Sequence, residues 1–207
     1  MDDAAGFQDI PPTTLADLLG REQVMDIGIR PLWPSMPRVA GPAFTVRCPA
    51  GDNLMLHAAI HRAPAGSVIV VEAGDVDYAV AGGNVCAVAQ RNGIAAFVID
   101  GVIRDLGEIR DMRFPVFARG VLPIPGGKAA VEPLNAQVTC GGVQVNAGDI
   151  VVADEEGVVV APRDRGARLL ADARAKLAKE SAETLDMWEA AHRSRIDQIL
   201  AAQGYQD

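Results

Sequence analysis

The chain has 207 residues, of which 49% are hydrophobic and 4% aromatic, and its formal net charge is −8. This length fits one domain, or one domain with a helical extension. An acidic chain without a basic run binds nucleic-acid backbones poorly, so we expect no DNA or RNA partner. No apolar run approaches the roughly 20 residues that span a bilayer. The acidic N-terminus also lacks the apolar segment of a secretory signal, so we expect a cytoplasmic protein without membrane contact.

Strands and helices are expected to alternate over the first 120 residues, which favours a mainly parallel sheet with helical layers. The first residues read as a tail ending at Pro11-Pro12. Strands are expected at residues 43–48, 67–72, 95–100 and 115–118. Helices are expected after a Thr13 or Thr14 cap, after an Asp52 cap, over 84–92, and from Asp105 to about Met112. Gly101 is expected to turn the chain after its strand.

The pattern changes after Gly120. Short β segments at 137–145, 149–153 and 157–161, separated by turn residues, predict an antiparallel meander packed on the α/β unit. Residues 164–202 are helical in pattern and highly charged. Their narrow apolar stripe is typical of a peripheral helix that lies on its own domain or on a neighbouring subunit. The stripe consists of Leu170, Leu177, Leu185, Trp188, Ile196 and Ile199.

A glycine pair, Gly82-Gly83, precedes the helix expected over 84–92. Glycines here let the backbone N–H groups of Asn84 and Val85 face a ligand, and the helix dipole favours a carboxylate or a phosphate. By itself such a pair is more often a simple turn.

Arg104 and Asp105 closely follow a predicted buried strand, and ligands of open α/β sheets gather at the carboxyl ends of strands. Arginine can bind a carboxylate through two parallel hydrogen bonds. Aspartate is a hard oxygen ligand that suits Mg²⁺ or Mn²⁺. Glu108 follows Asp105 by three positions, so both carboxylates would share one helix face. Taken alone, these residues favour a surface cluster of ion pairs over a metal site.

The spacing of Gly83, Arg104-Asp105 and Glu108 resembles the G-x20-R-D-x2-E/D signature of RraA-like proteins. This family includes class II pyruvate aldolases and regulators of ribonuclease activity. The stretches VIDGVIRD and FPVFARG resemble the family nearly word for word. The likeness extends through VAGPAFTV, PAGDNLMLHAAI and CGGVQVNAGDIVVADEEGVVVAP, and it covers roughly residues 12–165.

The resemblance implies an αββα sandwich of the swivelling β/β/α type. It assigns residues 1–163 to the catalytic domain and 164–207 to a C-terminal helical extension. It also implies a homotrimer or a hexamer with sites at subunit interfaces. The implied activity is that of a lyase dependent on Mg²⁺ or Mn²⁺. Such a lyase cleaves 4-hydroxy-2-oxo acids, such as 4-hydroxy-4-methyl-2-oxoglutarate, or decarboxylates oxaloacetate through a pyruvate enolate.

Carried over by position, Arg104 would hold the keto oxygen and the carboxylate of a small 2-oxo acid. Asp105 would ligate the metal, partly through water. The pair Gly82-Gly83, with the amides of Asn84 and Val85, would bind the pyruvyl carboxylate. Together with Glu108, Arg104 and Asp105 form the predicted catalytic set.

One departure concerns Gly83, because the characterised aldolases of this family carry aspartate there. Either Glu108 takes over the role of that side chain, or aldol cleavage is weak. Decarboxylation asks less of a base, since no hydroxyl proton has to be removed. We therefore expect oxaloacetate decarboxylation to survive better than aldol cleavage.

Other polar residues carry weaker signals. His57 and His61 have a spacing that can bind zinc, but a packed or surface pair is the better interpretation. Residues 154–156 are predicted to form a solvated turn. By resemblance, Glu180 or Glu183 could approach the metal-bound waters of a neighbouring subunit. Two sets of residues complete the predictions. The cysteines (Cys48, Cys86, Cys140) are predicted to be buried free thiols. The lysines (Lys128, Lys176, Lys179) lie outside the signature segment, which agrees with a metal mechanism.

The competing interpretation is a non-catalytic protein that binds an endoribonuclease or its helicase partners. The signature is shared by such regulators, so it cannot separate the two classes. The long C-terminal extension, which short regulators lack, favours the enzyme.

Overall fold

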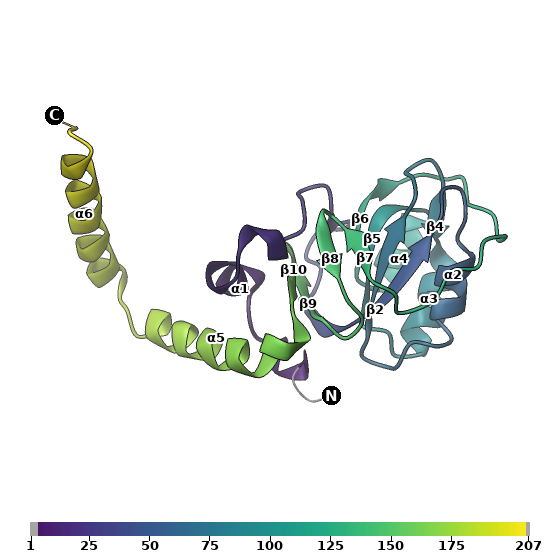
Figure 1. Cartoon of the computed structure of the whole chain (residues 1–207), viewed down its shortest axis with the longest axis horizontal. Coiled ribbons are helices and arrows are strands. Elements are labelled where there is room, and N and C mark those ends of the chain that lie inside the picture. The colour runs from purple at the N-terminus through teal and green to yellow at the C-terminus, as the bar shows by residue number, and fades with distance from the viewer. Residues whose placement is uncertain (1–3, 206–207) are drawn as a thin grey trace.

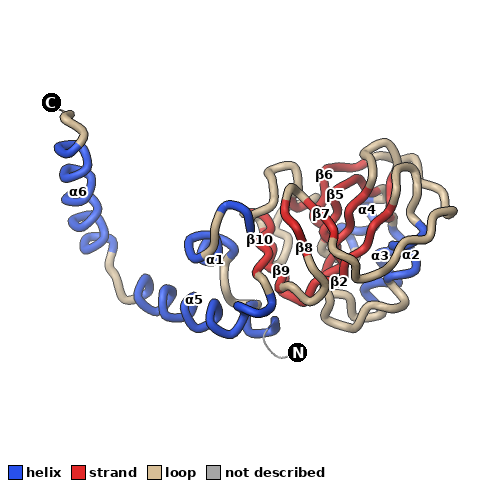
Figure 2. Tube along the Cα trace, viewed as in Figure 1, coloured by secondary structure: helices blue, strands red, loops and turns tan. Residues whose placement is uncertain are grey.

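The central element of the computed structural model, which describes residues 4–205, is an eight-stranded sheet (Figures 1 and 2). Its strand order is β1–β6–β5–β3–β2–β9–β10, and β4 pairs with β5. The strands are β1 (Arg30–Pro31), β2 (Val39–Cys48), β3 (Val68–Ala73), β4 (Ala79–Ala81), β5 (Ala96–Ile103), β6 (Val116–Val121), β9 (Ile150–Asp154) and β10 (Gly157–Ala161).

Parallel pairing in the middle of the sheet determines where a ligand can bind. Strands β2, β3, β5 and β6 run parallel, so their carboxyl ends meet at one edge. The outer strands β1, β9 and β10 pair antiparallel. A bridge between Val24 and Val159 brings the segment before β1 against β10, so the sheet curls nearly to closure.

The strands after Gly120 differ from the predicted meander. Strands β9 and β10 extend the main sheet through pairing of β9 with β2. Only β7 (Val138–Cys140) and β8 (Val143–Val145) form a separate two-stranded sheet. The reason is that β2 is four residues longer at its start than the predicted 43–48, and Val39–Pro42 offers β9 a free edge. The α/β class is therefore observed, while the particular αββα sandwich stays a prediction.

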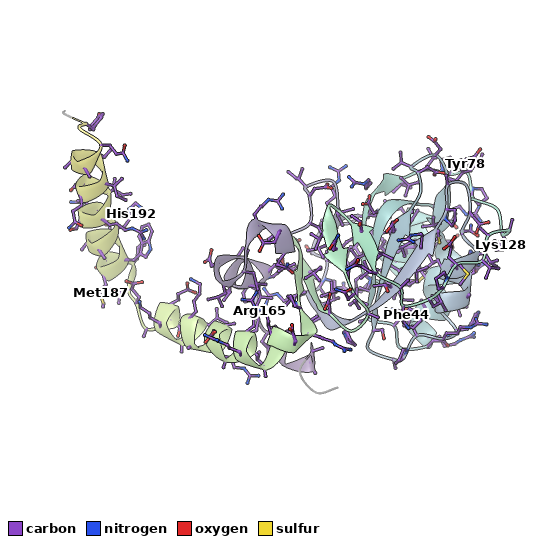
Figure 3. The ribbon with its side chains drawn as sticks, in the orientation of Figure 1. Phe44, Tyr78, Lys128, Arg165, Met187 and His192 are labelled. Atoms are coloured by element: carbon purple, nitrogen blue, oxygen red, sulfur yellow. The ribbon has the colours of Figure 1, made fainter. Side chains whose placement is uncertain are left out.

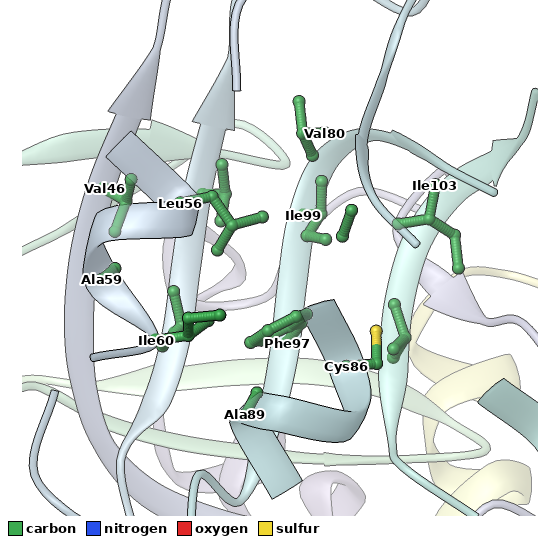
Figure 4. Close-up of a cluster of buried hydrophobic side chains, with 14 of the residues drawn as sticks. Val46, Leu56, Ala59, Ile60, Val80, Cys86, Ala89, Phe97, Ile99 and Ile103 are labelled. Carbon is green, nitrogen blue, oxygen red and sulfur yellow. The ribbon is translucent and has the colours of Figure 1, made fainter. Parts of the chain in front are cut away.

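Three helices cover one face of the sheet: α2 (Leu54–Ala59), α3 (Gly83–Arg91) and α4 (Leu106–Asp111). Their apolar sides meet the alternating inward residues of β5 in a buried cluster (Figure 4). Leu56 of α2 and Cys86 of α3 belong to this cluster with Phe97 and Ile99. The ring of Phe97 meets that of Phe114 edge to face, with centroids 4.9 Å apart.

The hairpin β7–β8 and the loop around β1 cover the opposite face. Buried there are Trp33 and Cys140, packed against strand residues such as Val70 and Val98. With Cys48 and Cys86 in the first cluster, the prediction of three buried free thiols is confirmed. Within residues 4–205, no helix combines the length and the apolar composition needed to cross a membrane.

The predicted N-terminal tail is wrong for the described residues. The 3₁₀ helix η1 (Ala4–Phe7) places Phe7, which is fully buried, in a third cluster against β9 and β10. Helix α1 (Pro12–Leu18) follows. It begins at Pro12 without a side-chain cap, so the predicted Thr13 or Thr14 cap is also wrong. Proline suits the first helical position, because a backbone N–H at that position would have no acceptor within the helix.

Gly101 does not turn the chain, because β5 continues through it to Ile103. The pairing of β5 with β6 shifts register between Ile99 and Val102, which marks an irregularity at Gly101. A side chain at Gly101 would meet Cβ of Ala73 at 2.6 Å, so close packing requires glycine here. The extension carries Arg104 further along the sheet edge than the sequence indicated.

Two helices follow a short η3 turn (Arg163–Arg165). Helix α5 (Gly166–Ser181) packs on the body of the protein through Leu169 and Ala173, beside α1 and η1. Helix α6 (Leu185–Ala202) has no buried residue and projects away from the sheet (Figure 1). A further 3₁₀ turn, η2 (Arg21–Gln23), lies between α1 and β1.

An ion-pair network fastens the loop before β1 to the sheet. Arg119 of β6 donates to Asp100 of β5 and, at 2.9 Å, to Asp26 in the loop. Asp100 also accepts from the N–H of Gly141 in the β7–β8 turn, at 2.8 Å. The hydrogen bond from Arg119 lowers the pKa of Asp26 against the opposing effect of burial.

Arg119→Met should therefore lower the free energy of unfolding at pH 7 by about 2 kcal/mol, because two carboxylates lose their shared cation. Ionised Asp26 stabilises the fold above its unfolded pKa of 3.8, and this stabilisation is lost as pH falls through the lower folded-state pKa. The difference between wild type and variant in urea titrations should therefore shrink as pH falls below 3.8. Arg110→Met, which removes only an exposed pair with Asp111, is the control and should cost under about 0.5 kcal/mol. Equal losses for both variants would contradict this assignment.

Candidate active site

A cavity of about 190 Å³ lies at the carboxyl edge of the parallel strands. Strand β4, the first turn of α3, the residues after β5, helix α2 and the loop after β6 all contribute to its wall. The lining residues are Asn53, His57, Ala79, Val80, Ala81, Gly82, Asn84, Val85, Arg104, Asp105, Pro125 and Lys128. Ligands of open α/β folds bind at this edge.

Asp105 sits at a sharp turn between β5 and α4. Its backbone is left-handed, with φ 59° and ψ 37°, a conformation that aspartate tolerates better than most residues. The turn directs its carboxylate back to α3, where Oδ2 accepts from the N–H of Gly83 at 3.0 Å. Nε of Arg104 lies 3.5 Å from the same oxygen. The side chains of Arg104 and Asp105 therefore lie together beside the start of α3.

Helix α3 presents two backbone donors to the cavity. It begins at Gly83, so the first-turn N–H groups of Asn84 and Val85 have no acceptor within the helix. Asn84 and Val85 both line the cavity, as the sequence predicted. There is no room for a side chain at Gly82, because a Cβ there would meet Oδ2 of Asp105 at 2.5 Å and Cγ of Arg104 at 3.1 Å.

Gly83 and Glu108 lie beside the cavity rather than in its wall. The Glu108 carboxylate occupies the space that a side chain at Gly83 would fill: a Cβ there would overlap Oε2 and lie 3.0 Å from Cδ. Two carboxylates, those of Asp105 and Glu108, therefore border the same glycine. The arrangement is compatible with the predicted replacement of a residue-83 carboxylate by Glu108.

Three polar residues that the sequence interpretation did not place in the site also line the cavity. They are Asn53, His57 and Lys128. Asn53 is 2% exposed, and its Oδ1 has no hydrogen-bond partner among the described residues. Its Nδ2 donates to the carbonyl of Gly126 at 3.2 Å. Burial lowers the pKa of His57, and the charges of Lys128 and His61 lower it further.

Asp52 fixes the loop that carries Lys128. Its carboxylate accepts from Leu54 N–H at 2.8 Å and from the N–H groups of Ala129 and Ala130 at 2.5 and 3.1 Å. Burial would raise the pKa of Asp52, but these three bonds outweigh it and lower the pKa. The N-cap of α2 is Asn53, so the predicted Asp52 cap is wrong by one position.

Two sequence interpretations need correction here. His57 is half-buried and lines the cavity, a position that the sequence interpretation did not assign to it. Lys128 reaches the cavity although it lies outside the signature segment, so the lysine positions do not argue for a metal mechanism. A usable signal existed, since residues 52–53 and 126–128 follow the parallel strands β2 and β6, whose carboxyl ends share one edge.

Other predicted acidic residues serve elsewhere. The predicted solvated turn over 154–156 is confirmed for Glu155 and Glu156, which are exposed, but Asp154 is buried and bonded to Arg38 at 2.9 Å. Glu155 accepts from the N–H of Ser35 at 2.7 Å. Glu180 pairs with Lys176 at 2.6 Å on α5, and Glu183 is exposed beyond it. Helix α5 lies at the other end of the molecule from α2 and α3 (Figure 1).

The donor set fits a hard, largely hydrated cation. Within residues 4–205, no group of three or more His, Cys, Asp or Glu side chains is arranged to enclose a metal. The site instead offers Asp105, with Glu108 close by. Mg²⁺ keeps several waters and is commonly held by one or two carboxylates. A closed structural zinc site would need four protein ligands.

Comparison with known proteins identifies the family of the chain. Residues 5–160 match the family described as RraA-like, Aldolase/RraA. The chain belongs to the RraA-like family. A relative from Halalkalibacterium halodurans, named as a proposed 4-hydroxy-4-methyl-2-oxoglutarate aldolase, is 36% identical over 200 residues, covering 96% of this chain and 91% of the relative.

RraA-like crystal structures share the fold. The RraAS2 protein of Streptomyces coelicolor, titled an unusual member of the RNase ES inhibitor RraA family, has a TM-score of 0.78 at 26% identity. That match covers 87% of this chain and 94% of RraAS2. The RNA-processing inhibitor RraA from Thermus thermophilis has a TM-score of 0.68 at 26% identity, covering 74% and 93%. The RraA-like relatives thus include both proposed aldolases and inhibitors.

Gly83→Ala tests the contact with Glu108 in this RraA-like site. The added methyl should displace the flexible carboxylate without unfolding the chain. Turnover should then fall about as far as in Glu108→Ala, roughly 10- to 100-fold, and the double variant should be no worse than either single one. Gly107→Ala in α4 is the control, since a Cβ there meets nothing within 4 Å. Additive losses in the double variant would show that the two residues act separately.

Proposed function

We propose that the protein is a divalent-metal-dependent lyase that releases pyruvate from small 2-oxo acids. Its reactions would be aldol cleavage of 4-hydroxy-2-oxo acids and decarboxylation of oxaloacetate. The observation that carries the proposal is the convergence of Arg104, the free first-turn N–H groups of α3 and the Asp105 carboxylate on one small cavity. Positive and negative groups placed together in this way suit an anionic substrate that binds beside a cation.

Substrate binding follows from the donors. The N–H groups of Asn84 and Val85, aided by the helix dipole, bind the carboxylate next to the keto group. Arg104 donates to the keto oxygen, where negative charge develops as the bond breaks. The planar guanidinium can make two parallel hydrogen bonds and so also fixes the orientation of the substrate.

The cation would be held by Asp105, with Glu108 ordering water next to it. When bound, Mg²⁺ or Mn²⁺ supplies Lewis-acid stabilisation of the enolate oxygen. The hydrogen bond from Gly83 orients Asp105 and leaves its second oxygen available. The position of Glu108 against Gly83 supports a role as the substitute for a carboxylate at residue 83.

Both reactions pass through the same enolate. In aldol cleavage the 4-hydroxyl loses its proton, the C3–C4 bond breaks, and its electron pair passes to the keto oxygen, which Arg104 stabilises. In decarboxylation the C3–C4 bond breaks with loss of carbon dioxide and needs no such base. Protonation of C3 then gives pyruvate in either case. If Glu108 replaces the residue-83 carboxylate only in part, the reaction that needs no base should suffer less.

The cavity residues Lys128 and Asn53 suit a second carboxylate of the substrate. Lys128 supplies positive charge there, and the unpartnered Oδ1 of the buried Asn53 can accept from a hydroxyl. Oxaloacetate and 4-hydroxy-4-methyl-2-oxoglutarate both carry such a carboxylate. The proposal further includes a trimer or hexamer, in which Glu180 or Glu183 of a neighbour could approach the cation.

Pyruvate release from oxaloacetate should be faster than from 4-hydroxy-4-methyl-2-oxoglutarate, and EDTA should abolish both. Arg104→Ala should lower kcat/KM by at least about 100-fold, because an oxyanion donor is lost. The assay couples pyruvate to lactate dehydrogenase, with Arg110→Ala as a control for an exposed arginine. Faster aldol turnover would contradict the role given to Gly83.

Lys128 makes a Schiff-base mechanism the alternative to exclude. Borohydride treatment in the presence of pyruvate should leave Lys128 unlabelled, as judged by peptide mass, while EDTA stops turnover. Labelled Lys128 with EDTA-resistant turnover would replace the metal mechanism.

If no 2-oxo acid is turned over, the inhibitor relatives give the second candidate, a ribonuclease-binding protein. Asp105→Asn should then leave partner affinity unchanged.

A further inference from the structure

His57 lines the candidate active site, yet the proposed function gives it no role. It lies half-buried on helix α2, at the end of the molecule where Figure 3 shows Lys128. Among the described residues, none forms a hydrogen bond with the imidazole that affects its pKa. The ring nitrogens are therefore open to a ligand in the cavity.

The surroundings of His57 favour the neutral imidazole. Burial lowers its pKa most, and the charges of Lys128 and His61 lower it further. Arg104 adds positive charge to the same wall, and its partner Asp105 is the only carboxylate among the described residues that line the cavity. The parts of the wall from β4 and α3 carry no titratable side chain. A neutral imidazole has one nitrogen that can accept a proton.

The other side chains of the site are less suited to take a proton from a substrate. Arg104 and Lys128 are cations that only donate. Asp105 is assigned to the metal ion, and Glu108 lies beside the cavity rather than in its wall. The asparagine side chains are amides, which are not basic at neutral pH. His57 is thus the lining residue best suited to act as a base.

A second observation on α2 points to a ligand that carries a hydroxyl group. Asn53, one turn before His57, is 2% exposed, and its Oδ1 has no hydrogen-bond partner among the described residues. A buried acceptor without a donor is costly, so a ligand that donates to it stabilises the site. Asn53 and the neutral imidazole together present two acceptors to the cavity, which suits a ligand with a hydroxyl donor.

We propose that His57 is the general base for aldol cleavage and takes the proton of the substrate's 4-hydroxyl. This role rests on the proposed lyase function, which lacked a base. As the proton moves to the imidazole, C4 becomes a carbonyl carbon and the electron pair of the C3–C4 bond passes into the enolate. The imidazolium then returns the proton to C3, so pyruvate leaves and His57 is neutral again.

The position of Lys128 explains how the hydroxyl reaches His57. In 4-hydroxy-4-methyl-2-oxoglutarate the 4-hydroxyl and the second carboxylate are attached to the same carbon atom. Lys128, which suits that carboxylate, is close enough to His57 for its charge to lower the pKa of the ring. Binding of the carboxylate at Lys128 therefore leaves the hydroxyl on the side of His57. Oxaloacetate has no 4-hydroxyl, so its decarboxylation gives His57 no proton to remove.

His57→Asn should lower kcat for aldol cleavage by about 100-fold or more, because a general base is lost. Decarboxylation of oxaloacetate should fall much less, so the ratio of the two rates should drop by at least about 30-fold. Both rates are measured with Mg²⁺ as pyruvate release in the coupled assay. The matched control is His61→Asn, which alters the exposed histidine four positions further along, outside the wall, and should keep the wild-type ratio.

Acid pH should act on the wild type in the same direction. Since burial and neighbouring charges lower the pKa of His57, its imidazole becomes protonated below the ordinary value of 6.5. The ratio of aldol cleavage to decarboxylation should therefore fall below pH 6.5 in the wild type and stay constant in His57→Asn. Free imidazole should also restore aldol cleavage to His57→Ala, which separates loss of the base from a fault in folding.

Equal losses of both reactions in His57→Asn, or a ratio no lower than that of His61→Asn, would overturn the proposal and leave the lyase in place. Wild-type protein that decarboxylates oxaloacetate but cleaves no 4-hydroxy-2-oxo acid would do the same. If the wild type turns over neither substrate, the proposed function itself fails, and the role of His57 fails with it.

Discussion

The hydrogen bond from the N–H of Gly83 to Asp105 joins the two segments on which the candidate active site depends. It forms only because the backbone of Asp105 turns into the left-handed region directly after β5. That turn aims one carboxylate at the start of α3 and leaves Arg104 in the cavity wall. A residue with a branched side chain would resist this backbone conformation, since its Cβ would crowd the carbonyl. The site is therefore built on a local conformation that favours aspartate.

Charge in the cavity runs against the charge of the whole protein. The chain carries a net charge of −8, yet the wall presents Arg104, Lys128 and the positive end of α3. The carboxylates of Asp105 and Glu108 lie at one side of these groups. A pocket of this kind suits the small anion, and the cation beside it, of the proposed function.

The two C-terminal helices differ in how they pack. Helix α5 uses Leu169 and Ala173 to complete a cluster that also contains Phe7 from the N-terminus. Helix α6 contributes to no cluster among the described residues. The predicted stripe from Leu170 to Ile199 treated both helices as one surface, because periodicity reports that a face is apolar and not what covers it.

Sequence by itself predicted the alternation of strands and helices, the helix that starts at the glycine pair, and the position of Arg104 and Asp105 after a buried strand. These features follow from local periodicity and from motif spacing, which neighbours in the chain determine. Tertiary structure decided the rest. Asn53, His57 and Lys128 enter the cavity because parallel strands bring the loops after β2 and β6 to one edge. Strand β9 joins β2 because the early residues of β2 leave an edge unpaired. Such contacts join residues far apart in sequence, and only the folded chain specifies which of them meet.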